Sequence, residues 1–158
     1  MKFSNTFKFL VSIIIAEGTG LIGSIFTMPN IPTWYADIVK PSWVPPSSVF
    51  APVWTLLFFL MGLAFFLVWK KGFKMKNVKT GMTMFLVQLL LNIIWSILFF
   101  GLQNPGAAFV EIIILWIFIL FTIISFSKVS KLAAWLLVPY IAWVTFASIL
   151  NYTIWILN

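Results

Sequence analysis

Hydrophobic residues form long, nearly uninterrupted runs along this chain and rarely alternate with polar ones. An α-helix needs about 20 predominantly apolar residues to cross the hydrocarbon core of a bilayer, and five runs reach that length. Their approximate limits are residues 5–27, 47–70, 79–102, 104–128 and 130–157. The pattern therefore predicts an all-α integral membrane protein, with residues 1–158 forming one domain, a bundle of five transmembrane helices.

Local signals mark several helix ends. Asn104-Pro105 is typical of an N-cap followed by proline at the first helical position, where no amide hydrogen is needed. Ser130 is a suitable N-cap for the fifth helix. The first run contains Glu17 and lacks a small-residue cleavage motif, so we interpret it as a membrane span and not as a signal peptide.

The connection between the first two helices is the longest, from Met28 to Pro46. It contains five prolines and three aromatic residues, which make it stiff and amphipathic. Residues 33–39 are expected to form a short helix with Thr33 as its cap. Because long ordered connections are usually functional, we predict that this Pro/Trp-rich segment is a lid.

Composition and charge agree with a membrane location. Of all residues, 63% are hydrophobic and 8% are charged, whereas a soluble domain has roughly 25% charged residues. All ten basic residues are lysines, and only Lys40 falls on the side of the lid. The positive-inside rule then places the N-terminus in the cytoplasm, with the lid and the C-terminus outside, in what we expect to be a bacterial cytoplasmic membrane. The lysines are expected to meet lipid headgroups and not nucleic acid.

The chain has neither cysteine nor histidine. Disulfides, thiolate metal sites and imidazole chemistry therefore lack their residues. We expect no metal and no cofactor. Glu17 and Glu111 could suggest a proton or ion relay, but two carboxylates on separate helices are a weak signal, and their roles stay open.

Aromatic and polar residues recur at helical spacing in three of the predicted spans, mostly in the halves beneath the lid. The three stripes are Phe50, Trp54 and Phe58; Gln88, Asn92, Trp95 and Phe99; and Trp143, Ala147 and either Leu150 or Asn151. Intramembrane polar groups are costly unless they are paired or face a cavity. The stripes favour a cavity, although Asn92 and Asn151 could equally link helices, and Trp69, Trp116 and Trp155 are interpreted as interfacial residues.

Small residues follow one face of the first helix at Ala16, Gly20 and Ser24. Such a face allows the backbones of two helices to approach closely. Two interpretations remain, packing inside the bundle and a homodimer contact.

Several motifs resemble the translocator protein family, also called tryptophan-rich sensory proteins or peripheral-type benzodiazepine receptors. They are Trp34-Tyr35, Lys40-Pro41-Ser42-Trp43-Val44-Pro45-Pro46, Pro52-Val53-Trp54, Gln88-Leu89, Leu91-Asn92, Trp95, Phe99-Phe100-Gly101, Pro139-Tyr140-Ile141-Ala142-Trp143, Phe146-Ala147 and Leu150-Asn151-Tyr152. The resemblance covers nearly the whole chain in the same order, and it suggests a bacterial member.

The resemblance implies a five-helix bundle, often dimeric, whose cavity is closed by the first connection. It implies as ligands tetrapyrroles such as protoporphyrin IX, sterols in some members, and synthetic isoquinoline carboxamides and benzodiazepines. The ligand-binding residues carried over are Trp34, Trp54, Asn92, Trp95, Trp143, Phe146 and Ala147, to which the stripes add Phe58 and Phe99. The resemblance also implicates Trp54 and Trp143 in light-dependent porphyrin breakdown.

We therefore expect a membrane receptor or sensor that binds hydrophobic tetrapyrroles, with Lys40 as a candidate partner for propionates. No conventional catalytic constellation is visible, and light-dependent degradation by way of Trp54 and Trp143 is the alternative. A porphyrin or sterol transporter is a further alternative. The sterol motif is incomplete, because no basic residue follows Leu150 and Tyr152.

Overall fold

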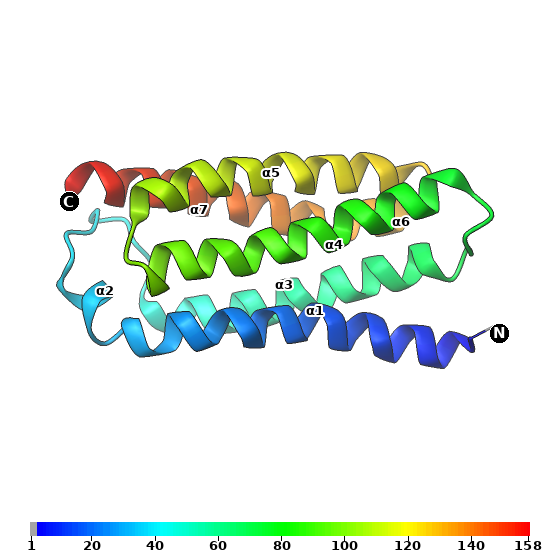
Figure 1. The fold of residues 1–158 in the computed structure, drawn as a ribbon, viewed down its shortest axis with the longest axis horizontal. Coiled ribbons are helices and arrows are strands. Elements are labelled where there is room, and N and C mark those ends of the chain that lie inside the picture. The colour runs from blue at the N-terminus through cyan, green and yellow to red at the C-terminus, as the bar shows by residue number, and fades with distance from the viewer. Residues whose placement is uncertain (1–2) are drawn as a thin grey trace.

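The structure, a computed structural model, describes residues 3–158 except for the side chain of Lys76. Within that range all regular secondary structure is helical (Figure 1). The helices are α1 (Asn5–Thr27), α2 (Trp34–Asp37), α3 (Ser47–Trp69), α4 (Lys76–Ser96), α5 (Pro105–Ser127), α6 (Lys131–Leu136) and α7 (Val138–Leu157). A 3₁₀ turn (Met28–Asn30) follows α1, and a π-helical turn (Ile97–Gly101) extends α4.

Five helical segments of the described chain are long and apolar enough to cross a membrane. They are α1, α3, α4 with its π-helical turn, α5, and α6 together with α7. This finding confirms the predicted all-α membrane architecture. The third span begins at Lys76, three residues earlier than the sequence pattern predicts.

The long helices lie side by side, and successive spans run in opposite directions (Figure 1). The most extensive helix contacts are those between α4 and α5 and between α1 and α3. Helix α2 and the end of α7 lie at one end of the bundle, which we call the loop end. The start of α1 lies at the opposite end, which we call the N-terminal end.

Helices α1 and α3 are in close contact because Gly62 lacks a side chain. A Cβ atom at Gly62 would lie 3.1 Å from the Cα atom of Ile13 and 3.1 Å from the carbonyl oxygen of Ser12. Both atoms belong to the backbone of α1, so neither can rotate away. The two helices therefore meet backbone to backbone at this point.

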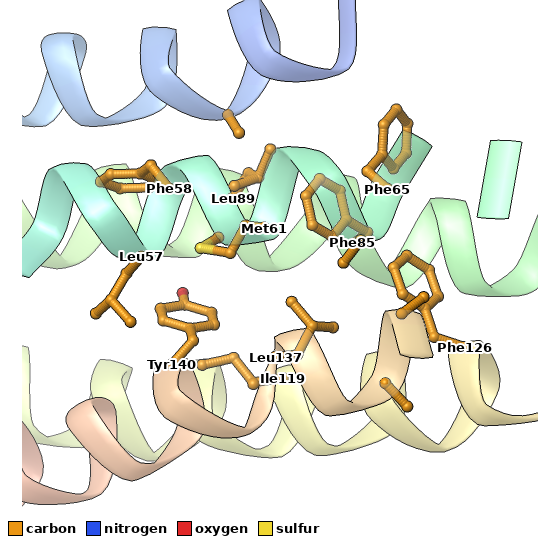
Figure 2. Close-up of a cluster of buried hydrophobic side chains, with 14 of the residues drawn as sticks. Leu57, Phe58, Met61, Phe65, Phe85, Leu89, Ile119, Phe126, Leu137 and Tyr140 are labelled. Carbon is orange, nitrogen blue, oxygen red and sulfur yellow. The ribbon is translucent and has the colours of Figure 1, made fainter. Parts of the chain in front are cut away.

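Aromatic and aliphatic side chains fill the middle of the bundle and its N-terminal half (Figure 2). Phe85 is central to this core, with its ring centroid 4.7 Å from that of Phe65 and 5.8 Å from that of Phe126. A second buried cluster occupies the loop end and includes Tyr35, Phe99 and Phe100. The N-terminal half is thus solidly packed, while the loop end combines a smaller cluster with open space.

The third span ends in a wider turn than the sequence pattern predicts. The amide of Leu102 donates to the carbonyl of Ile97 at 2.7 Å, five residues back, and Gln103 follows with a φ of 50°. Gly101 lies in this turn, where a Cβ atom would be 3.2 Å from the ring of Phe26 on α1. The turn brings two adjacent aromatic residues, Phe99 and Phe100, into the buried cluster.

The fifth span is not the continuous helix expected for residues 130–157. It divides at Leu137 into α6 and α7. Pro139 accounts for the break, because it has no amide hydrogen and its ring would clash with the carbonyl four residues earlier. The helical bonding resumes where the amide of Ile141 donates to the carbonyl of Leu137 at 3.1 Å.

The predicted caps at Asn104 and Ser130 are confirmed. The side-chain oxygen of Asn104 accepts from the amide of Ala107 at 3.0 Å, and Ser130 accepts from the amide of Ala133 at 3.3 Å. The short helix predicted for residues 33–39 is present but spans only Trp34–Asp37, and Thr33 occupies its N-cap position without a side-chain capping bond. Its hydroxyl donates backward to a carbonyl of the preceding turn, Pro29, at 3.0 Å and accepts nothing from α2.

Candidate functional site

A cavity of about 250 Å³ lies at the loop end, between α1, α3, the end of α4 and α7. Its walls are mainly apolar and aromatic. Tyr35 of α2 contributes to the wall from the connection. The cavity occupies the half of the bundle in which the sequence placed the polar and aromatic stripes.

Seven of the nine predicted ligand-binding residues line this cavity. They are Trp54, Phe58, Asn92, Trp95, Phe99, Trp143 and Ala147. The other two lie behind the wall. Trp34 packs edge-on against Phe99, with ring centroids 5.6 Å apart, and Phe146 packs against Trp43 at 5.9 Å and Trp143 at 5.4 Å.

The three indoles of the cavity wall differ in the contacts that they make with the rest of the protein. Trp95 donates its N–H to the side-chain oxygen of Asn151 at 2.9 Å. The Nε1 atom of Trp143 is buried and has no hydrogen-bond partner among the described residues. Trp54 stacks on Phe58, with centroids 5.5 Å apart. The N–H of Trp143 is therefore buried and unpaired, whereas that of Trp95 is paired.

Asn92 presents an acceptor to the cavity. Its Nδ2 donates to the hydroxyl of Tyr140 at 3.1 Å, and that hydroxyl donates to Oε1 of Gln88 at 2.8 Å. Because these hydrogen bonds engage the nitrogen of the Asn92 side-chain amide, its oxygen is the atom left for a ligand. The same bonds tie α4 to α7, so Asn92 also links helices.

Asn151 is fully engaged inside the protein. Its oxygen accepts from Trp95, and its Nδ2 donates to the carbonyl of Pro105 at 2.7 Å. One side chain on α7 thus connects α4 and α5. Asn151 therefore links helices, which is one of the two roles that the sequence allowed for it.

Helix α1 supplies a wall that the predicted site omits. Glu17, Gly20, Ser24 and Thr27 all line the cavity, and their spacing of three and four residues puts them on one face. A Cβ atom at Gly20 would lie 2.7 Å from the ring of Phe58, so the small-residue face packs inside the bundle. The spacing of these small residues was visible in the sequence, but it did not distinguish packing inside the bundle, a homodimer contact and a cavity wall. The homodimer remains a prediction.

The cavity opens sideways between α1 and α3. Some lining residues are strongly exposed, including Leu21 at 69% and Met28 at 63% on the α1 side, and Thr55 on α3. The α1–α3 contact near Gly62 lies further toward the N-terminal end. Since these helices span the membrane, the opening faces lipid.

Three side-chain hydrogen bonds attach the connection to the loop end of the bundle. The amide of Asn158 accepts from the backbone N–H of Val39 at 3.0 Å and donates to the carbonyl of the same residue at 3.0 Å. At the other side, Nε2 of Gln103 donates to Oδ1 of Asn30 at 3.2 Å. The connection is therefore attached both to the end of α7 and to the turn after α4.

Lys40 is occupied within the connection. Its ammonium donates to the carbonyls of Tyr35, Ala36 and Ile38 at 2.5, 3.0 and 2.9 Å. An ammonium has three donors, and all three are used at the C-terminal end of α2. The expected partnership of Lys40 with propionates is therefore not supported. Burial raises the pKa of the Tyr35 hydroxyl above its usual value, so the phenol beside Lys40 stays neutral.

Glu111 lies away from the cavity lining. It is only 7% exposed, and neither carboxylate oxygen has a hydrogen-bond partner in the described chain. Nε2 of Gln88 is also buried without a partner. No group of three or more metal-ligating His, Cys, Asp or Glu side chains occurs in residues 3–158.

Fold and cavity together define a class, the α-helical membrane proteins of five spans that enclose a mainly apolar cavity beneath a Pro/Trp-rich connection. Residues 11–156 match the TspO/MBR family. The chain is 50% identical over 139 residues to the tryptophan-rich protein TspO of Chlorobaculum tepidum, covering 88% of each chain. It is 46% identical over 154 residues to that of Archaeoglobus fulgidus, covering 98% of this chain and 99% of the relative.

The similarity extends to animals. The translocator protein of Ovis aries is 38% identical over 144 residues, which cover 90% of this chain and 85% of the relative. The chain therefore belongs to the TspO/MBR family.

Proposed function

We propose that this protein is a membrane receptor or sensor that binds hydrophobic tetrapyrroles, such as protoporphyrin IX, in the cavity beneath its first connection. The observation that carries the proposal is the indole and phenyl lining, with Trp54 and Trp143 on facing helices. Flat macrocycles are held well by aromatic faces, and a few polar groups such as Asn92 orient their edges.

The cavity volume sets a condition on this function. At about 250 Å³ the cavity is smaller than the roughly 300–1,000 Å³ typical of ligand pockets. A macrocycle therefore requires the connection to shift or a part of the ring to protrude through the opening between α1 and α3. Isoquinoline carboxamides and benzodiazepines are smaller and suit the same space.

Titration of the purified protein with protoporphyrin IX in the dark tests the proposal. Quenching of tryptophan fluorescence should saturate, because the indoles of the wall come into contact with the macrocycle. Trp155→Phe is a matched control, since Trp155 is exposed and lies outside the cavity. Linear, unsaturable quenching, identical to that of free tryptophan, contradicts the proposal. Uptake of porphyrin by sealed vesicles would instead favour the transporter.

Light-dependent degradation of the porphyrin is the second candidate. The position of Trp143 in the cavity wall favours it, because an indole in contact with an excited porphyrin can serve as an electron donor. The chemistry would belong to the excited porphyrin and oxygen.

Trp54→Phe and Trp143→Phe are expected to leave dark binding nearly intact and to slow light-driven porphyrin loss. Phenylalanine keeps an aromatic face, so most of a stacking contribution of about 1 kcal/mol survives. It is much harder to oxidise than indole, so electron donation falls. The measurement is the degradation rate per bound porphyrin, with Trp155→Phe as control. An unchanged normalised rate in both variants would make the protein a binder only.

The proposed orientation places the N-terminus in the cytoplasm and the connection outside, in a bacterial cytoplasmic membrane. The basis is the lysine asymmetry of the sequence. Because the chain has no cysteine, Phe3→Cys and Ala36→Cys each introduce one label site. An impermeant maleimide applied to intact cells should label position 36 and spare position 3. The reverse result would invert the topology.

A further inference from the structure

One ionisable group lines the cavity without a partner. Glu17 lies in the middle of α1, and its carboxyl forms no hydrogen bond or ion pair with the described residues. It shares its helix face with Gly20, where the ring of Phe58 comes closest to α1. Phe58 in turn stacks on Trp54. A carboxyl and two stacked aromatic rings thus line the same cavity from α1 and α3.

The cavity offers no cation to balance this carboxyl. None of its described lining residues is basic. Lys40 is held by three carbonyls of the connection, and Lys8, the other lysine nearest along the chain, lies in the first turn of α1. An ionisable group inside a membrane is costly unless it is paired, and it usually marks a binding site or pathway.

We propose that Glu17, Trp54 and Phe58 form a cation-recognition site, which takes the protonated amine of a flat, apolar organic molecule. The carboxylate supplies the counter-charge. The half-buried indole of Trp54 attracts the cation, and the buried ring of Phe58 stacks on that indole and holds it in place. The apolar body of the ligand fills the rest of the lining toward Trp143. A molecule of this kind is small enough for a cavity of about 250 Å³ with the connection in place.

This site lies in the cavity proposed for tetrapyrroles but recognises the opposite charge. The propionates of a porphyrin are anionic and would be repelled by Glu17, so a bound porphyrin must direct them away from it. Glu17→Gln removes the charge, keeps nearly the same shape and retains an acceptor oxygen. The substitution is therefore expected to weaken amine binding while leaving porphyrin affinity equal or higher.

The test compares 1-naphthylmethylamine with 1-naphthylmethanol, a neutral molecule of nearly the same shape, by calorimetric titration in detergent at pH 7. Wild type should prefer the amine, and Glu17→Gln should lower its affinity by at least about tenfold while changing that of the alcohol less than about twofold. Glu111→Gln is the matched control, because that carboxyl is also intramembrane but lies outside the cavity lining. It should leave the amine-to-alcohol ratio unchanged.

Equal binding of amine and alcohol by wild type overturns the proposal, whatever the variants do. An equal loss of amine affinity in Glu17→Gln and Glu111→Gln also overturns it, since the effect would then not be local. Titrating protoporphyrin IX against the same three proteins separates the two functions. Failure of porphyrin binding with intact amine selectivity would refute the tetrapyrrole receptor alone, and the opposite result would refute this site alone.

Discussion

Replacing Gly62 with valine is expected to destabilise the bundle more than any other single change considered for this chain. The new side chain would meet the Cα atom of Ile13 and the carbonyl of Ser12, and backbone atoms cannot move aside without separating α1 from α3. Overpacking of this kind costs about 3 kcal/mol. The measurement is the fraction of protein that remains monodisperse in detergent after heating, and the midpoint should fall sharply.

Gly18→Val is the matched control for this prediction. Gly18 lies on α1, and a Cβ atom there would have no heavy atom within 4 Å. Both substitutions replace glycine with valine inside a helix, so intrinsic helix propensity largely cancels in the comparison. If the two variants melt at the same temperature, the backbones of α1 and α3 are not in contact at Gly62.

Replacing residues 34–43 with a Gly/Ser linker of equal length should weaken tetrapyrrole binding by at least about tenfold, because a rigid cover excludes water and a flexible one must be ordered on binding. The linker removes the rings of Trp34 and Tyr35 that cover Phe99 and Phe100. The bundle itself should stay folded, since its core lies in the other half. Absorbance of the porphyrin reports the affinity independently of the tryptophans removed.

Asn158→Ala provides a milder version of the same experiment. It removes both hydrogen bonds to Val39 but leaves every aromatic residue of the connection in place. An intermediate loss of affinity is expected, with faster release of the ligand. Unchanged affinity in the linker variant would show that the connection does not act as a lid.

The membrane spans were predictable because lipid imposes a simple rule. Backbone groups cannot be left unsatisfied in hydrocarbon, so long apolar runs must be helices. The caps at Asn104 and Ser130 were predictable for a similar reason, since their bonds are local. The π-helical turn at Ile97–Gly101 was not, because it accompanies a close approach of α1 to Gly101. Pro139 was visible, but membrane helices often tolerate proline, so the break at Leu137 did not follow from it.

The candidate site was predicted on three of its walls and missed on the fourth. Trp54, Trp95 and Trp143 stood out because large aromatic residues at helical spacing are conspicuous. The α1 wall consists largely of small residues, and a small residue allows close packing and open space equally well. The engagement of Lys40 within the connection was missed for a different reason. Its ammonium could donate to a ligand or to backbone carbonyls. Only the fold shows that the carbonyls at the end of α2 lie within hydrogen-bond distance of it.

The sideways opening between α1 and α3 changes what a measured affinity means for this protein. Leu21 and Met28 border the opening on the α1 side, so an apolar ligand arrives from the bilayer and not directly from water. The concentration that governs occupancy is then the mole fraction of ligand dissolved in the lipid. Doubling the amount of lipid or detergent at constant total ligand lowers the mole fraction of ligand in the lipid. The apparent binding then weakens, although no contact between ligand and protein has changed. Dissociation constants for such ligands are comparable only when they are expressed per lipid, after the partition coefficient has been measured.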